Sequence, residues 1–126
     1  MLTTTGSRNN QVKGKHPLKG VDPLLKERVK CFLAGATYCW CKNHPRKPFS
    51  AANLVGGHYD DWEGTPLVEL TNLYCKRKNK NAAEAAAGVA VGKLLQEVLI
   101  NSPMQFVRTS DEYVAHYTLV KKGDQE

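Results

Sequence analysis

The sequence predicts a mainly α-helical domain that ends in a β-hairpin, an α+β fold. Apolar residues recur at helical spacing through most of residues 22–100. Aspartate–proline and threonine–proline pairs, which are typical of helix starts, precede two of these stretches. After Pro103 the pattern changes to β-branched and aromatic residues, which are typical of strands. The predicted elements are helices at about 22–43, 50–56, 65–76 and 82–100 and a hairpin at 104–121.

The first helix has the clearest start and stop signals. Asp22 is placed as the N-cap, and Pro23 occupies the first helical position. The helix is expected to end near Asn43, before Pro45. One helical face carries a set of apolar residues, namely Leu25, Val29, Phe32, Leu33, Ala36 and Trp40.

The second helix is predicted to be short. Ser50 is its expected cap, and Phe49 and Leu54 have the spacing of a hydrophobic staple. Gly56 and Gly57 are expected to end it.

The third and fourth helices lie on either side of the segment "KRKNKN". Thr65 and Pro66 predict the start of the third helix. Asn81 is the expected cap of the fourth, with Glu84 three residues later as an imperfect capping box. Its inward face is predicted to carry Val91, Leu94, Leu95 and Val98.

The predicted hairpin joins "MQFVRT" and "YVAHYTLV" through "SDE". On the second strand one face carries Tyr113, Ala115, Tyr117 and Leu119. The other face carries Val114, His116, Thr118 and Val120.

Length and composition predict one domain with flanking segments. The 126 residues, 41% of them hydrophobic, are sufficient for a single modest core. Residues 1–21 are expected to form a flexible basic arm, residues 22–122 the domain, and residues 123–126 a disordered tail. No apolar run is long enough to span a bilayer, and the first residues lack the apolar core of a secretory signal. We therefore expect a cytoplasmic protein with no membrane partner.

The charge is unevenly distributed along the chain. The formal net charge is +6. Residues 1–20 contain Lys and Arg but no acid, whereas residues 48–75 contain acids but no Lys or Arg. Lys76, Arg77, Lys78 and Lys80 then follow together. Such segregation is typical of a molecule with one cationic face for a polyanion, although a solvated surface is an equally good explanation of the net charge alone.

The order of helices, a long helix and a C-terminal hairpin resembles the winged helix-turn-helix family. In that family the helix before the hairpin lies in the DNA major groove, and the hairpin, or wing, touches the adjacent backbone. The segments "DWEGTPLVELTNLY" and "AGVAVGKLLQEVL" are also similar to winged-helix segments of small phage or mobile-element proteins. The resemblance covers residues 22–122 and implies a DNA-binding regulator of transcription or an accessory factor.

The resemblance assigns the contacts to the start of the long helix, its exposed side and the hairpin. A helix start offers backbone N–H groups and a positive dipole end to phosphate. The expected nucleic-acid-binding residues are Lys76, Arg77, Lys78, Lys80, Asn81, Lys93, Gln96, Arg108, His116, Lys121 and Lys122. The expected partner is DNA, or RNA, with the protein associated with the nucleoid. We expect no enzymatic activity, no cofactor and no small-molecule substrate.

The cysteines leave a zinc site open as an alternative. Cys39, Cys41 and His44 are close in sequence, and Cys75 is available as a further ligand, as is Cys31. Zinc prefers thiolate and imidazole ligands. Two cysteines separated by one residue on a helix point about 200° apart, however, which makes shared coordination difficult. Buried free thiols are therefore favoured over zinc, and a disulfide is not expected in an intracellular chain.

The segment "GGHYDDWEG" leaves a second alternative, a small metal-dependent nuclease. His58, Asp60, Asp61 and Glu63 have the composition of a divalent-cation site. Acids beside a helix start also have a structural role, because they interact favourably with the helix dipole. We favour that structural role.

A third alternative is a protein-interaction module without nucleic-acid binding. The strand "EYVAHYTLV" is apolar on both faces, so one face is expected to cover the helices and the other to be available for a homodimer. Fold alone does not separate this alternative from DNA binding.

Overall fold

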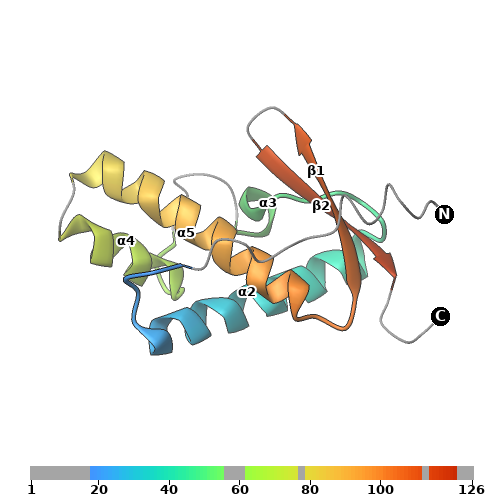
Figure 1. Ribbon diagram of the computed structural model, residues 1–126, viewed down its shortest axis with the longest axis horizontal. Coiled ribbons are helices and arrows are strands. Elements are labelled where there is room, and N and C mark those ends of the chain that lie inside the picture. Colours follow the sequence, from blue (N-terminus) through green and yellow to red (C-terminus); the bar gives the residue numbers. More distant parts are fainter. Residues whose placement is uncertain (1–17, 56–61, 77–78, 112–113, 122–126) are drawn as a thin grey trace.

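The computed structural model of the chain describes residues 18–55, 62–76, 79–111 and 114–121. It has a helical body and a two-stranded antiparallel sheet (Figure 1). In chain order the elements are α2 (Pro23–Asn43), α3 (Ala51–Val55), α4 (Leu67–Cys75), α5 (Lys80–Ile100), β1 (Gln105–Asp111) and β2 (Val114–Lys121). The predicted class, mainly helical with a C-terminal hairpin, is confirmed. No helix within these described ranges is long and apolar enough to cross a membrane.

The start of α2 follows the sequence prediction. The Asp22 carboxylate accepts hydrogen bonds from the backbone N–H groups of Leu24 and Leu25, at 3.1 and 3.3 Å. Pro23 is the first helical residue. These bonds satisfy N–H groups that have no partner within the helix, so the cap fixes where α2 begins.

The folded body begins before residue 22, which corrects the predicted boundary of the basic arm. Leu18 and Val21 are buried and belong to the hydrophobic core. The Lys26 ammonium also donates to the backbone carbonyl of Leu18. Burial of two apolar side chains offsets the entropy lost when this segment is ordered. The rest of the predicted arm, residues 1–17, lies outside the described residues, as does the predicted tail at 123–126.

The residues before α3 connect the helical body to the hairpin. Ser50 and Asn53 form a reciprocal cap: the Asn53 N–H donates to Ser50 Oγ at 3.2 Å, and the Ser50 N–H donates to Asn53 Oδ1 at 2.9 Å. Phe49 is fully buried, and its backbone exchanges two hydrogen bonds with Tyr117, at 2.8 and 2.7 Å. The sequence prediction contained the cap at Ser50 but not this bridge to β2.

The start of α4 and the segment before it are fixed by side-chain hydrogen bonds and an ion pair. The Thr65 hydroxyl donates to the Trp62 carbonyl at 2.7 Å and accepts from the Leu67 N–H at 3.2 Å. Trp62 is half-buried against the core. Arg28 of α2 forms an ion pair with Glu69 of α4. The helix begins at Leu67, slightly later than predicted.

The start of α5 differs from the prediction by two residues. The cap is Asn79, whose side-chain oxygen accepts from the Ala82 N–H at 2.8 Å, and Lys80 is the first helical residue. The prediction that Asn81 caps this helix is wrong, because Asn81 lies inside the first turn. Glu84 is then too far along the helix to complete a capping box with the true cap.

The hairpin has a defined register and one face on the core. The pairs include Phe106 with Leu119, Arg108 with Tyr117 and Thr109 with His116. Residues directly opposite on paired strands project from the same face. Phe106, Tyr117 and Leu119 are buried, so theirs is the core face. The predicted alternation along β2 is therefore confirmed for its described residues.

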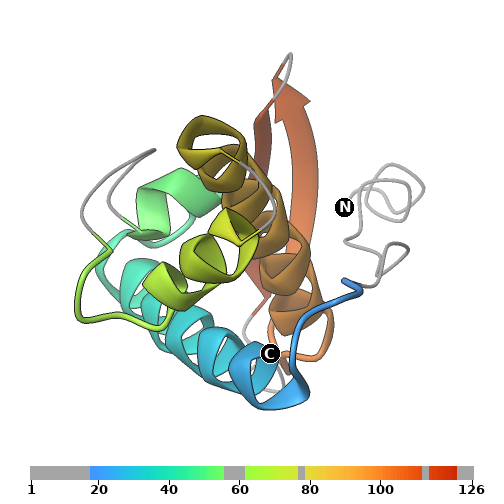
Figure 2. The ribbon, with the colours of Figure 1, turned by 90° about the vertical axis from the view of Figure 1, so that its left-hand side faces the viewer.

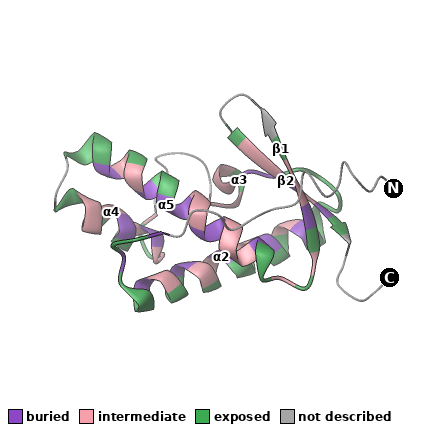
Figure 3. Cartoon of the chain, in the orientation of Figure 1, coloured by how far each residue is buried: buried purple, intermediate pink, exposed green. Residues whose placement is uncertain are grey.

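The centre of the body is α5, which contacts α2, α3, α4 and β1. Figure 3 shows buried residues along α5 where it faces the other helices. Its buried residues are Ala83, Ala87, Ala90, Val91, Leu94, Leu95 and Leu99. Small side chains fill the first half of this face and larger ones the second half. One long side of α5 therefore stays outside the core.

Candidate nucleic-acid interface

The start of α5 exposes two of the predicted cations. Lys76, just after α4, and Lys80, the first residue of α5, are both exposed. Asn79 lies between them as the cap. Because backbone N–H groups in a first helical turn lack carbonyl partners within the helix, this end combines partial positive charge with lysine ammonium groups. Arg77 and Lys78, predicted in the same cluster, lie outside the described residues.

Farther along α5, the predicted contacts are less accessible. Asn81 is exposed in the first turn, but Lys93 and Gln96 are half-buried. Between Asn81 and Lys93, the exposed side of α5 carries small or apolar residues. Val89 is 59% exposed there, and a Cβ added at Gly88 or Gly92 would meet nothing within 4 Å. This side of α5 therefore offers few side chains that could hydrogen-bond to base edges.

The two predicted hairpin contacts lie on opposite faces of the sheet. Arg108 pairs with Tyr117 and thus belongs to the core face, whereas His116 pairs with Thr109 on the outer face. The Arg108 Nε is buried and has no hydrogen-bond partner among the described residues. His116 is half-buried. The expectation that both grip phosphate from one surface is therefore not supported by the register. Lys121 ends β2, and Lys122 lies outside the described residues.

The lysines and the hairpin are separated along α5. This helix has 21 residues, which corresponds to about 30 Å from end to end. Lys76 and Lys80 lie at its first end, and β1 follows its last end. Figures 1 and 2 both show the start of α5 and the free end of the strands toward the upper side, with α2 toward the lower side. A ligand that touches both must extend along the molecule.

The structure does not bring the proposed zinc ligands into one group. Cys41 is buried on the inner side of α2, whereas Cys39 is exposed. The His44 ring packs on Trp40 with 4.3 Å between centroids. Cys75 is exposed at the end of α4. Within the described ranges, no group of three or more His, Cys, Asp or Glu side chains could hold a metal ion.

The proposed nuclease cluster falls mainly in a segment that the structure does not describe. His58, Asp60 and Asp61 lie outside the described residues. Glu63 is described and is exposed. The nuclease alternative therefore stays a sequence-based hypothesis.

Comparisons with known proteins add no family assignment: no family model matches the chain, and neither does any curated protein or solved structure.

One feature of the surface has no counterpart in the sequence prediction. A cavity of about 840 Å³ lies between α2, the end of α5 and the segment that leads into β1. Its walls come from residues 30–42, 97–104 and 119, which are distant in sequence. The only sequence feature that could have indicated this cavity is Thr37, a polar residue among the apolar residues on the inward side of α2.

Proposed function

We propose that this protein binds nucleic acid, with duplex DNA as the principal ligand, and acts as a regulator or accessory factor. One observation carries the proposal: Lys76 and Lys80 are exposed on either side of the capped start of a 21-residue helix. Phosphate groups are stabilised at such a position by the helix dipole, free N–H groups and ammonium charge together. The net charge of +6 adds a long-range attraction for a polyanion.

A long ligand suits this arrangement better than a compact one. The start of α5 and the free end of the hairpin project toward the same side but at different positions along the body (Figures 1 and 2). A duplex extending along that side would contact both. The winged-helix assignment belongs to this proposal, and it rests on the order of elements, in which a long helix directly precedes a hairpin.

The side chains on the exposed side of α5 favour binding to the backbone over recognition of sequence. Ala82, Ala85, Gly88 and Val89 carry no hydrogen-bonding groups. Specific recognition of bases requires such groups in the groove. We therefore propose contacts that are mainly with phosphate and that differ little between sequences.

The proposal is tested by fluorescence anisotropy with a labelled DNA duplex and a matched RNA duplex across a salt series. Binding through phosphates predicts that the logarithm of affinity falls linearly with the logarithm of salt concentration. It also predicts similar affinity for unrelated DNA sequences. Binding that is absent at low salt, or present but insensitive to salt, would remove the proposal.

A protein-interaction role is the second candidate, and the exposed side of α5 favours it. Gly costs about 1 kcal/mol relative to Ala inside a helix. Gly88 and Gly92 have this cost, yet the space beside them is open. Val89, between them, is 59% exposed. The absence of side chains at these two glycines allows another helix to pack closely against this side of α5. Sedimentation velocity distinguishes this role, because it predicts a concentration-dependent dimer that Gly88→Leu would abolish.

A further inference from the structure

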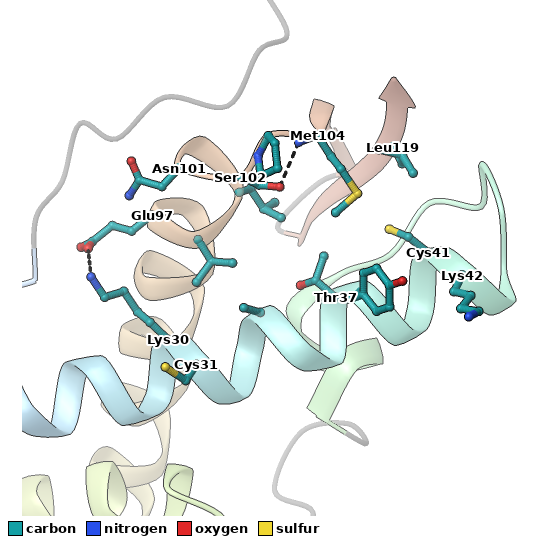
Figure 4. Close-up of a pocket in the computed structure, with 15 residues that line it drawn as sticks. Lys30, Cys31, Thr37, Cys41, Lys42, Glu97, Asn101, Ser102, Met104 and Leu119 are labelled. Carbon is teal, nitrogen blue, oxygen red and sulfur yellow. Dashed lines mark hydrogen bonds and ion pairs between the residues drawn. The ribbon is translucent and has the colours of Figure 1, made fainter. Parts of the chain in front are cut away.

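The cavity beside α2 is large and mostly apolar. Its volume of about 840 Å³ lies within the range of small-molecule sites, roughly 300–1,000 Å³. Figure 4 shows it between the middle of α2, the end of α5 and Met104, with Leu119 of β2 at the far side. The apolar wall residues are Ala34, Val98, Leu99, Pro103, Met104 and Leu119. An apolar ligand group would therefore be removed from water here.

One buried polar group in the wall lacks a partner. Thr37 is 2% exposed, and its hydroxyl forms no hydrogen bond with any described residue. Figure 4 shows the Thr37 side chain extending from α2 into the space beneath Met104. A threonine in a helix can bond to the carbonyl one turn earlier, but this hydroxyl does not. Because an unpaired buried hydroxyl is destabilising, this position favours a ligand that carries a hydrogen-bonding group.

The two ends of the cavity differ in charge. At one end, Lys30 lies 3.1 Å from Glu27 and 3.5 Å from Glu97, so its charge is compensated. Lys42 lines the other end and is exposed. It forms no ion pair with the residues that the structure describes. The Lys42 end therefore carries net positive charge, which complements an anion.

We propose that this cavity binds an amphipathic monocarboxylate with a linear medium-length hydrocarbon chain. The carboxylate accepts the Thr37 hydroxyl hydrogen, and the positive charge of Lys42 at that end of the cavity attracts it at longer range. The chain extends from Thr37 past Ala34 and Val98 toward Lys30. Those seven residues of α2 correspond to about 10 Å, which matches an extended medium-length chain. This site is independent of the lysines at the start of α5.

The direct test is isothermal titration calorimetry of the full chain with sodium dodecanoate below its micelle concentration. Decanoate, octanoate and dodecylammonium serve as probes of chain length and charge. Burial of the chain predicts about fourfold tighter binding for each methylene that lies inside the cavity, and no further gain once the chain is longer than this space of about 10 Å. Recognition of the carboxylate predicts that dodecylammonium binds at least tenfold more weakly. No dodecanoate binding, or equal binding of the cation, would overturn the proposal.

Three variants, each with a matched control, test the assigned residues. Thr37→Val keeps the shape but removes the hydroxyl, and it should weaken dodecanoate binding roughly tenfold without lowering the thermal midpoint. Lys42→Gln should weaken binding severalfold, whereas Lys47→Gln should not. Ala34→Trp should fill the cavity and abolish binding, whereas Ala85→Trp, on the exposed side of α5, should leave it unchanged. Wild-type affinity in both Thr37→Val and Ala34→Trp would contradict the site.

Discussion

Neutralising the lysines at the start of α5 should change the salt dependence of nucleic-acid binding in a calculable way. Lys76 and Lys80 are both exposed, and neither forms an ion pair with a described residue. Each phosphate contact contributes about 0.9 to the slope of log affinity against log salt for duplex DNA. The double variant Lys76→Gln/Lys80→Gln should therefore have a slope smaller by about 1.8.

That difference in slope corresponds to a difference in affinity that is easy to measure. Between 50 and 200 mM salt, two contacts account for roughly a twelvefold loss of affinity. The fold-loss of affinity over this range should therefore be roughly twelve times larger for the wild-type protein than for the double variant. Fluorescence anisotropy with one labelled duplex measures both proteins under identical conditions, and a thermal melt checks that the fold is unchanged.

The matched control removes two other exposed cations. Arg46 and Lys47 follow the end of α2 in sequence. Figure 1 shows the end of α2 and the start of α5 at opposite ends of the body. Arg46→Gln/Lys47→Gln lowers the formal net charge of +6 by the same two units. If the two double variants had the same slope, binding would depend on net charge alone, and the assignment to the start of α5 would be refuted.

Four further predictions concern the fold that positions this surface. Asn79→Ala removes the cap of α5 and should lower the free energy of unfolding by about 1 kcal/mol, as measured by urea denaturation. Leu95→Ala, at a fully buried position of α5, should lower it by about 2–5 kcal/mol, and a loss below 1 kcal/mol would contradict the packing described. Gly88→Ala and Gly92→Ala should each raise the free energy of unfolding by about 0.5–1 kcal/mol, because the added Cβ meets open space. A lowered thermal midpoint in these variants would show that this space is occupied. The hydrogen bond to Glu27 raises the pKa of Lys30 above its usual value of 10.5, so stability from this group is present at neutral pH and lost as the pH rises above about 10.5. Lys30→Met should flatten that alkaline loss in urea titrations, and an unchanged pH profile would exclude the contribution.

Signals confined to a few neighbouring residues were predicted well from the sequence. The Asp22–Pro23 start of α2 and the Ser50 cap of α3 appear where expected, because each depends on a side chain bonding to backbone two or three residues away. The alternation along β2 was also correct, since the two faces of a strand follow from its period of two residues.

The errors came from choices that local sequence leaves open. Asn79 and Asn81 are both good caps before a run of alanines, and only the geometry between α4 and α5 selects Asn79. Leu18 was assigned to the arm because its neighbours are polar and basic, although its side chain reaches the core. Arg108 and His116 were grouped together because alternation within one strand does not give the register between two strands.

The features formed by distant segments could not be predicted. The bridge between Phe49 and Tyr117 joins residues far apart in the chain, and no local pattern marks a single-residue pairing. The cavity beside Thr37 depends on how the end of α5 lies across α2. Both depend on tertiary packing, which propensity and periodicity do not encode.

Binding of phosphate at the start of α5 can be located by a nuclear magnetic resonance titration of the ¹⁵N-labelled protein with a short DNA duplex. We expect the largest amide shifts at Lys76, Asn79, Lys80 and Asn81, with smaller shifts in the hairpin, and we expect these shifts to disappear at high salt. Shifts confined to α2 and the cavity beside it, with none at the start of α5, would exclude phosphate binding at this position.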